Sequence, residues 1–470
     1  MKQTLSRESK KFPPESTQIP EKTRKNYPLY ALFVLLAVTI LNEIDNSVFA
    51  STSTDIARDL HLGINDLGFL ASAFTIAVTL SIIPVGIWAD RAKRKHVIAA
   101  CLAVWSLATT CTGLTGNFLA LFLTRTVVGS GEAGYAPTSN ALVGDLFGTA
   151  SRAKVLSWLA VSRIVGIVLG LITGGIIADL YTGSWRLAFL VAGIPGLLLV
   201  LAVWRLPEPV RHPADMKREG SSSFRGNARQ IFSNFWALSG IKTLIILIAM
   251  GILEAFALTS LTTFISPLLH QKDAFGLSSG QTGLFTGLGL GVSGVPGVLL
   301  GGYLADRLNR RYQGARVLVC GLSLLLAAPL SLAMILVAGT HNLNLFTVLF
   351  LATLFVDGAH AGSLAAARLD VVPALMRGSA VASAILLNRI LGSALAPTLV
   401  GSLARSFDPG GQHFQQLLAG HDLIQALAWT CPVAFLAAGV VGIIGLLWVE
   451  HDRVAAEQAD KQLDDTNGRH

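Results

Sequence analysis

About twelve apolar segments, each roughly 20 residues long, divide this chain of 470 residues. That length is what an α-helix needs to cross the hydrocarbon layer of a bilayer. Only 14% of the residues are charged, whereas soluble globular proteins carry about 25%. The pattern predicts an all-α membrane protein with 12 transmembrane helices. The predicted helices begin near Leu29, Asp66, Val97, Phe118, Val155, Trp185, Ile241, Gln281, Val317, Leu343, Gly378 and Leu423.

Lys and Arg are unevenly distributed among the polar stretches between these segments. They crowd the amino-terminal tail and every second loop after it, around 91–95, 152–154, 211–229 and 307–311. Cytoplasmic loops of membrane proteins carry such an excess, so both termini are predicted to be cytoplasmic, which requires an even number of spans. The net charge of +8 therefore reflects topology, and we expect no nucleic-acid partner. We expect the first segment to be retained as a helix and not cleaved as a signal peptide.

The two halves of the chain repeat one another. Gly86, Asp90, Arg91 and Arg94 recur at equal spacing as Gly302, Asp306, Arg307 and Arg310. Further matches pair Glu132, Asp145, Arg152 and Arg163 with Asp357, Asp370, Arg377 and Arg389. Such repeats predict two pseudo-symmetric six-helix bundles. The bundles are predicted at 29–206 and 237–450, with a cytoplasmic linker at 207–236, a disordered cytoplasmic tail at 1–28 and a cytoplasmic tail at 451–470.

Arg125 and Glu132 lie inside the fourth apolar segment, seven residues apart. Seven residues make nearly two helical turns, so both side chains share one helix face with Gly129. Two charges in a membrane helix need a polar interior to point into. They form either a working site in a cavity or a structural ion pair between helices. Carboxylates next to an arginine in such a place are suited to proton uptake and release.

The first segment contributes two more carboxylates, Glu43 and Asp45. On one helix these point about 200° apart, so both cannot face the same cavity. We assign Asp45, Arg125 and Glu132 to proton coupling, with Glu43 as a residue that shares or takes part of the role.

The remaining ionisable residues at membrane depth are candidates for substrate contact. Arg163 and Arg389 are suited to binding an anionic head group, or to pairing with the acids. His360 follows Asp357 by three residues, so the two can touch on one helix face. The predicted substrate-binding residues are Arg163, Arg389, Tyr135, Glu254, Asp357 and His360, of which the last three are equally compatible with packing.

The two repeated Asp-Arg loops are predicted to form a cytoplasmic gate, although simple anchoring by positive charge is the alternative. The predicted gate residues are Gly86, Asp90, Arg91, Arg94, Asp145, Asp306, Arg307 and Arg310.

Motifs of catalysis are missing from the sequence. It has no phosphate-binding G-x-x-x-x-G-K-[ST] loop and no Ser-His-Asp arrangement, so neither an ATPase nor another enzyme is predicted. The four cysteines lie in apolar segments without metal-ligand spacing. We expect no metal, no cofactor and no disulfide.

Twelve segments with G-x-x-x-D-R-x-x-R-[RK] in both halves resemble the major facilitator superfamily. Within it, Arg125, Gly129, Gly131, Glu132, Ala133 and Tyr135, followed by Asp145-Leu-Phe, are similar to the spinster family of lysolipid and sphingolipid transporters. That resemblance implies roles for Asp45, Arg125 and Glu132 in proton coupling. Asn46 stands where the family usually has Arg.

The resemblance implies an alternating-access transporter of an amphipathic lipid-like substrate, such as a lysophospholipid or sphingoid lipid, coupled to protons. We expect a monomer in a bacterial inner membrane, surrounded by membrane lipids. The alternatives are an organic-anion or sugar-acid symporter, a drug–proton antiporter and a sensor that does not transport. Phe350 stands where the repeat would match Arg125, so we expect a more apolar carboxyl-terminal half of the cavity.

Overall fold

The computed structural model describes residues 27–147, 149–206, 238–408 and 420–467. All regular structure in this part of the chain is helical, and 11 helices are long and apolar enough to cross a membrane. The remaining predicted span is interrupted, because α5 (Phe118–Glu132) and α6 (Tyr135–Leu146) are separated at Ala133 and Gly134. The all-α membrane fold predicted from the sequence is confirmed, with one of its twelve segments broken in the middle.

Six spans form the amino-terminal bundle. They comprise α2 (Tyr27–Asp59), α3 (Ile64–Arg91), α4 (Arg94–Thr112), α5 with α6, α7 (Thr149–Ala178) and α8 (Trp185–Trp204). Asn117 starts α5 by accepting a hydrogen bond from the backbone nitrogen of Ala120 at 2.9 Å, which satisfies one of the free donors at a helix start.

The carboxyl-terminal bundle begins after the linker. It comprises α11 (Lys242–His270), α12 (Ser279–Gly289), η1 (Leu290–Gly294), α13 (Val295–Asn309), α14 (Ala315–Ala338), α15 (Leu343–Asp370), η2 (Ala374–Met376), α16 (Arg377–Leu387), η3 (Asn388–Ser393), α17 (Ala396–Phe407) and α19 (Gly420–Asn467). Two spans contain a widened π-helical turn, η1 and η3. Such turns are frequent at functional sites.

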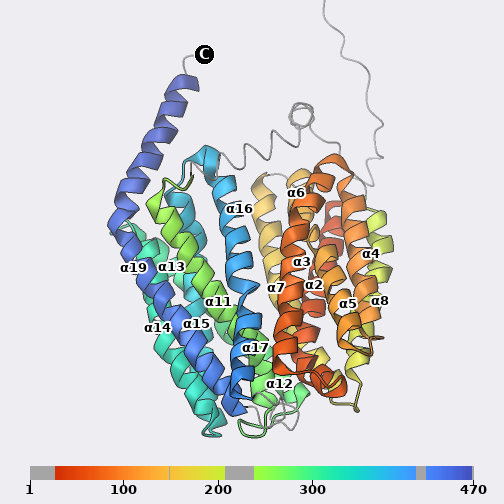
Figure 1. Cartoon of the computed structure of the whole chain (residues 1–470). Coiled ribbons are helices and arrows are strands. Elements are labelled where there is room, and N and C mark those ends of the chain that lie inside the picture. Colours follow the sequence, from red (N-terminus) through yellow and green to blue (C-terminus); the bar gives the residue numbers. More distant parts are fainter. Residues whose placement is uncertain (1–26, 148, 207–237, 409–419, 468–470) are drawn as a thin grey trace, which may run out of the picture.

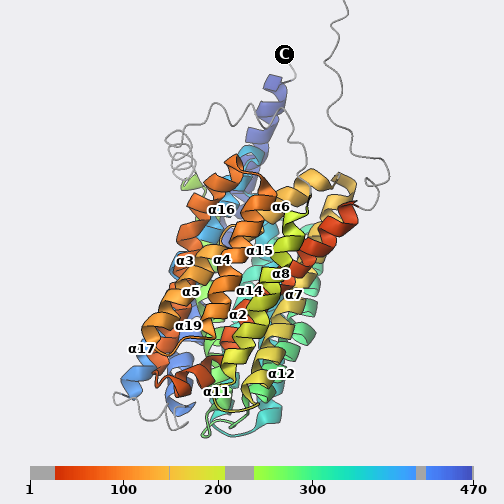
Figure 2. The ribbon, with the colours of Figure 1, turned by 90° about the vertical axis from the view of Figure 1, so that its right-hand side faces the viewer.

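The described chain begins and ends on the same side of the molecule. Tyr30, near the start of α2, donates to the backbone oxygen of Ala202 at the end of α8 (3.0 Å), and Asp452 of α19 accepts from the backbone nitrogen of Thr243 at the start of α11 (2.7 Å). We call this side, where α8 ends and α11 begins, the linker end, and the opposite side the far end. The predicted carboxyl-terminal tail is helical to Asn467, and Figures 1 and 2 show it projecting beyond the other helices at the linker end. The predicted tail at 1–28 and linker at 207–236 lie almost entirely outside the described residues.

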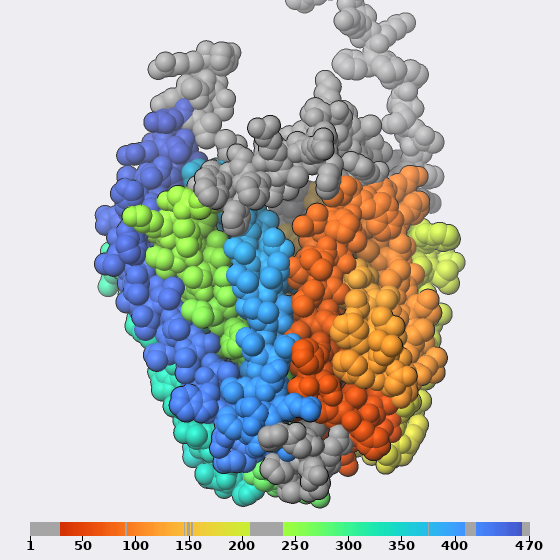
Figure 3. All heavy atoms as spheres, viewed as in Figure 1, coloured from red at the N-terminus to blue at the C-terminus, as the bar shows by residue number. Residues whose placement is uncertain are grey.

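The hydrophobic core is shared at the far end and divided at the linker end. One buried cluster joins the two bundles at the far end and includes Ile56, Trp185, Phe264, Phe346 and Val400. Towards the linker end each bundle has a core of its own. Figure 3 shows α17 against α3 in the lower part of the view, which is the far end. The bundles are therefore packed together at the far end in this conformation.

The glycines of α7 allow close packing within and between the bundles. A Cβ added to Gly166 would lie 2.6 Å from the backbone oxygen of Ile40, and one added to Gly170 would lie 2.7 Å from that of Ile44. Both distances are shorter than a carbon atom tolerates, so α2 can lie this close only to glycine. Small residues four apart thus form the surface on which the two helices meet.

Candidate functional site

Arg125 and Asp45 form a buried ion pair at the centre of the amino-terminal bundle. Nη1 of Arg125 lies 3.8 Å from Oδ1 of Asp45, and both side chains are 2% exposed. The other oxygen of Asp45 accepts a hydrogen bond from the hydroxyl of Thr109 on α4. Three helices, α2, α4 and α5, therefore meet at this pair. Breaking such a buried pair is costly, because it leaves an uncompensated charge.

Two aromatic rings hold the Arg125 guanidinium in place. Its central carbon lies 4.5 Å from the ring centre of Phe49 and 4.9 Å from that of Phe74, both within cation–π range. Phe74 lies this close because α5 presents Gly129 to α3, where an added Cβ would be 2.6 Å from the Phe74 backbone oxygen. Nε and Nη1 of Arg125 have no hydrogen-bond partner. Arg125 is thus positioned by stacking and charge, with donor capacity to spare.

Glu132 is held by an amide rather than by Arg125. Its Oε2 accepts a hydrogen bond from Nδ2 of Asn46 at 2.9 Å, while its Oε1 is buried without a partner. The charges of Arg125 and Glu132 act on each other, as their shared helix face predicts, but the ion pair of Arg125 is with Asp45. We call Asp45, Arg125 and Glu132 the buried charge set. Sequence reasoning named Asn46 only as a departure from the family and did not foresee this contact.

Glu43 and Asp45 point in different directions, as their spacing predicts. Glu43 faces α7, where its Oε1 lies 3.4 Å from Nε of Arg163. Arg389, on the widened turn η3 of the other bundle, acts electrostatically on Glu43 and Glu132. We call Glu43, Arg163 and Arg389 the open charge set, because the Arg163 side chain is 55% exposed. Glu132 is therefore the member of the buried charge set on which Arg389 of the open charge set acts.

Tyr135 lies behind these charges, in the interior of the amino-terminal bundle. It is 4% exposed, its hydroxyl is 2.8 Å from the backbone oxygen of Leu35 and 2.7 Å from the hydroxyl of Thr39, and its ring packs edge-on against Trp105. In this conformation the Tyr135 hydroxyl is hydrogen-bonded inside the bundle, so it is not available for the predicted contact with a substrate.

The carboxyl-terminal bundle brings Glu254 of α11 next to Asp357 and His360 of α15. Nε2 of His360 lies 4.0 Å from Oε2 of Glu254, and Nδ1 lies 3.8 Å from Oδ1 of Asp357. All three are buried. Arg368 is also buried, and its charge acts on Glu254. Sequence reasoning placed Arg368 in no site, so it missed this buried cation of the carboxyl-terminal bundle.

The predicted gate at the linker end is organised in the second repeat by a residue that was not predicted. Nη2 of Arg316 lies 2.7 Å from Oδ1 of Asp306, and its Nη1 lies 2.6 Å from Oδ1 of Asp370. Arg307 donates to the hydroxyl of Tyr303 at 2.9 Å. Arg310 is exposed. The residues predicted as a gate in this repeat thus take part in an Asp–Arg–Asp bridge between α13, α14 and α15.

In the first repeat, the described gate residues are Gly86 and Arg94. Nη1 of Arg94 donates to the backbone oxygen of Ala141 on α6 at 2.8 Å. A Cβ on Gly86 would meet nothing within 4 Å. The side chains of Asp90, Arg91 and Asp145 lie outside the described residues.

Asp179, directly after α7, binds the first residues of α12 across the bundle interface at the far end. Its carboxylate accepts hydrogen bonds from the Ser278 hydroxyl (2.6 Å) and from the backbone nitrogens of Ser279 (3.0 Å) and Gly280 (2.9 Å). A carboxylate at a helix start satisfies free backbone donors and interacts favourably with the helix dipole. Asp179 is thus a cap supplied by the opposite bundle.

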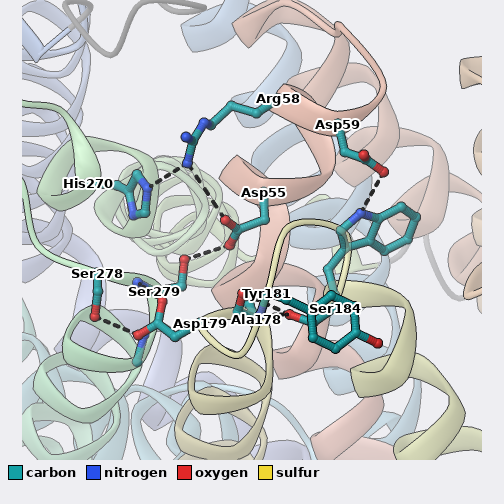
Figure 4. A network of polar contacts seen from close by, with 12 residues as sticks. Asp55, Arg58, Asp59, Ala178, Asp179, Tyr181, Ser184, His270, Ser278 and Ser279 are labelled. Atoms are coloured by element: carbon teal, nitrogen blue, oxygen red, sulfur yellow. Dashed lines mark hydrogen bonds and ion pairs between the residues drawn. The ribbon is translucent and has the colours of Figure 1, made fainter.

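Further polar contacts surround this cap, several of which are drawn in Figure 4. Asp55 of α2 accepts from the Ser279 hydroxyl at 2.5 Å, and Nη1 of Arg58 lies 3.5 Å from Nε2 of His270. On the other side of the interface, the Thr398 hydroxyl donates to Ser72 at 2.7 Å and Arg405 donates to Asn65 at 3.0 Å. Hydrogen bonds therefore close the interface at the far end on both sides.

Comparisons with known proteins agree with the fold of membrane-spanning helices described above. The sequence pattern of the Major Facilitator Superfamily matches residues 35–397. Protein spinster homolog 3 of Homo sapiens is 28% identical over 93% of this chain and 86% of its own length. An MFS-type efflux pump of Mycolicibacterium smegmatis is 30% identical over 85% of this chain and 91% of its own length.

A solved structure shares the fold. It is described as a bacterial homolog to the human lysosomal transporter spinster, in an inward-facing and unoccupied conformation. It matches with a TM-score of 0.76 and 24% identity, covering 92% of this chain and 98% of that one.

Proposed function

This chain belongs to the Major Facilitator Superfamily, and from that membership we propose that it is an alternating-access secondary transporter and not an enzyme. We propose an amphipathic lipid-like substrate, a lysophospholipid or a sphingoid lipid, moved together with protons. The similarity to spinster proteins over most of their length supports the substrate class. The observation that carries the proposal is the buried charge set, which lies next to the open charge set at the interface of the two bundles.

We place the protein as a monomer in the inner membrane of a bacterium, with the linker end in the cytoplasm. The distribution of Lys and Arg in the sequence supports this orientation. The far end then faces outwards and is closed, and the divided core at the linker end favours an inward-facing state.

The charge balance of the buried charge set supports proton coupling. Two carboxylates, Asp45 and Glu132, share one cation, Arg125, in an interior where unpaired charge is expensive. The set is neutral only when one carboxylate carries a proton. Because Asp45 has both Arg125 and Thr109 as partners, Glu132 is the better candidate for the protonated group. Movement of Arg389 relative to Glu132 would change how easily that proton leaves.

The open charge set supports recognition of a polar head group. Arg163 presents an exposed guanidinium, and Arg389 approaches from the opposite bundle. Two guanidinium groups can bind a phosphate or carboxylate by bidentate hydrogen bonds. Glu43 neutralises part of this charge while the site is empty, so an anionic head group would compete with Glu43 for Arg163. A cationic sphingoid base would instead bind near Glu43 and Glu132.

The test measures flux into proteoliposomes with a panel of lysophospholipids, sphingosine, organic acids and cationic drugs, with and without a pH gradient. Glu132→Gln is the decisive variant, because glutamine retains an oxygen for Asn46 but cannot release a proton. We expect wild-type lysolipid flux to follow the pH gradient and the variant to lose that dependence. The matched control is Asp59→Asn, a carboxylate that hydrogen-bonds within the amino-terminal bundle at the far end.

Either of two outcomes would contradict the proposal. If lysolipids and sphingosine do not move while organic acids do, the substrate class is wrong. If Glu132→Gln keeps the full response to the pH gradient, the coupling assignment is wrong, and Asp45→Asn beside Glu43→Gln then identifies the coupling carboxylate.

Drug efflux is the second candidate function, favoured by the similarity to an MFS-type efflux pump. The same panel separates it from lipid transport. An exporter of this kind would move structurally unrelated cations out in exchange for protons, and its flux would not require Arg163, whose positive charge repels them.

A further inference from the structure

The interior of the carboxyl-terminal bundle contains three metal-ligating side chains in one place. Glu254, Asp357 and His360 each offer a ligand atom, and these atoms lie within 4.8 Å of one another. The residues are 9%, 7% and 2% exposed. We call them the acidic–histidine cluster. It lies on α11 and α15, apart from the buried charge set of the other bundle.

The orientation of His360 leaves one ring nitrogen free to bind a cation. Nδ1 lies 3.1 Å from the backbone oxygen of Asp357 on the same helix. A carbonyl oxygen only accepts hydrogen bonds, so Nδ1 carries the hydrogen and Nε2 carries the lone pair. Metal-binding histidines characteristically donate their other N–H to such a carbonyl or carboxylate.

The free nitrogen of His360 faces a group that cannot hydrogen-bond to it. Nε2 is 4.0 Å from Oε2 of Glu254 and has no hydrogen-bond partner, and Oδ1 of Asp357 also has none. A lone pair and a carboxylate oxygen are both acceptors, and leaving them buried and unpaired is unfavourable. The separation exceeds the span of a hydrogen bond, which is about 2.7–3.2 Å. Two ligands of a tetrahedral ion, each about 2.0–2.2 Å from it, lie about 3.3–3.6 Å apart, so a shift of about half an ångström in these side chains would let both bind one cation.

We propose that Glu254, Asp357 and His360 bind a divalent transition-metal ion of the Zn²⁺ or Co²⁺ type. One imidazole nitrogen and two carboxylate oxygens are ligands that such ions accept, and three protein ligands leave a position for water or substrate. The two carboxylates balance the charge of the ion.

Arg368 limits how tightly such an ion is held. It is buried, its charge acts on Glu254 and His360, and its Nη2 donates to the backbone oxygen of Leu247 at 3.2 Å. One positive charge beside two carboxylates weakens the attraction for a cation. The bound ion is therefore exchangeable, and it is lost on treatment with a chelator.

The cluster lies near the part of α11 that packs against η3. Glu254 keeps 12% of its side chain exposed. One turn earlier on α11, a Cβ added to Gly251 would lie 2.6 Å from the amide nitrogen of Asn388, which belongs to the widened turn η3 that carries Arg389. Asn388 is followed directly by Arg389, so η3 connects the surroundings of the cluster with the open charge set.

The experiment measures Co²⁺ binding by the full chain in detergent, without a histidine tag and after chelator treatment. Visible d–d absorption reports coordination, and Zn²⁺ should displace the signal. We expect one Co²⁺ per chain, no binding to His360→Gln, and affinities reduced at least about tenfold by Glu254→Gln or Asp357→Asn, because even the loss of an outer-shell partner of a ligand costs about that much. His421→Gln, at an exposed histidine of α19, is the matched control and should bind as wild type does.

Metal binding by the cluster does not depend on transport, so this proposal can fail while the proposed function stands. Thermal unfolding of each variant confirms that it is folded, and Zn²⁺ should raise the unfolding temperature of wild type but not that of His360→Gln. Equal binding by wild type and His360→Gln overturns the proposal. The absence of Co²⁺ binding by wild type also overturns it. If Glu254→Gln then binds one titrating proton fewer than wild type, the cluster is a proton site.

Discussion

Replacement of Asp179 by alanine should open the far end of the molecule. Asp179 follows α7 in the amino-terminal bundle, and its carboxylate accepts three hydrogen bonds from the first residues of α12 in the other bundle. Alternating access requires that this interface separates. Because α12 would lose its cap supplied by the other bundle, Asp179→Ala should favour the state in which the far end is open.

The size of the effect follows from these three contacts. Hydrogen bonds contribute about 0.5–1.5 kcal/mol each, and Asp179 is exposed, so the lower half of that range applies. Three such bonds amount to about 2 kcal/mol. Since 1.4 kcal/mol corresponds to a factor of ten, the ratio of open to closed molecules should rise about thirtyfold. Asp179→Asn keeps one acceptor oxygen and should have a smaller effect.

Spin labels on the two bundles measure this change. Tyr181→Cys and Lys272→Cys place exposed labels at the far end, one on each bundle, in a chain whose four native cysteines are replaced. Pulsed electron–electron distance measurements should show a longer-distance population in Asp179→Ala. The matched control is Asp59→Ala, because Asp59 accepts from Trp185 and Arg186 of its own bundle at the same end.

Two results would refute the reasoning. An unchanged distance distribution in Asp179→Ala would mean that the cap does not contribute to closure. Equal broadening in Asp59→Ala would mean that any lost carboxylate loosens this end, whichever bundle its partners belong to.

Three more predictions test packing and charge. Gly170→Val should destabilise the fold by about 1–3 kcal/mol in thermal unfolding, because its Cβ would lie 2.7 Å from the Ile44 backbone oxygen, whereas Gly86→Ala should leave unfolding unchanged. Arg125→Lys should fold but lose most proton-coupled flux, since an ammonium cannot stack between Phe49 and Phe74 as a flat guanidinium does. Arg316→Gln should speed amide hydrogen exchange near Asp306, measured by mass spectrometry, whereas Arg310→Gln, at an exposed position, should not.

The helices of this fold are predictable from the sequence because their cause is local. Each span is an apolar run, and its length and flanking charges are visible without knowledge of its neighbours. The hydropathy pattern hides two exceptions. Ala133 and Gly134 interrupt a segment that is apolar throughout. Helix α19 continues past Glu450, where Asp452 and Asp460 accept hydrogen bonds from backbone nitrogens of other helices.

The site is predictable only in part, because sequence reveals which residues are expensive to bury but not which partners they meet. Arg125, Asp45 and Glu254 stand out as charges within apolar runs, and all three are buried. Asn46 and Thr109 carry no charge, so nothing in their neighbourhood marks them as partners of Glu132 and Asp45.

Charges near the ends of helices are the hardest to interpret. Arg316, Arg368 and Asp179 lie where a charged residue is ordinary, so the positive-inside pattern or simple exposure accounts for them in sequence. The structure gives each a specific contact across helices. The repeat aligns Phe350 with Arg125, so it gave no sign that Arg368, on another turn of α15, carries a buried positive charge.

The charges assigned to transport lie beside interruptions of the helices, and this placement has a mechanical consequence. Glu132 is the last residue of α5 before the break, and Arg389 is on the widened turn η3. A break lets α6 change direction while Gly129 keeps α5 packed on α3 and the rings keep Arg125 in place. Closure of the linker end can therefore alter the hydrogen bond of Glu132 with Asn46 and its electrostatic interaction with Arg389 without unpacking the buried pair of Arg125 and Asp45. A proton would then be exchanged at Glu132, next to the break. The pair of Arg125 and Asp45 would stay in place and set the electrostatic field at that site.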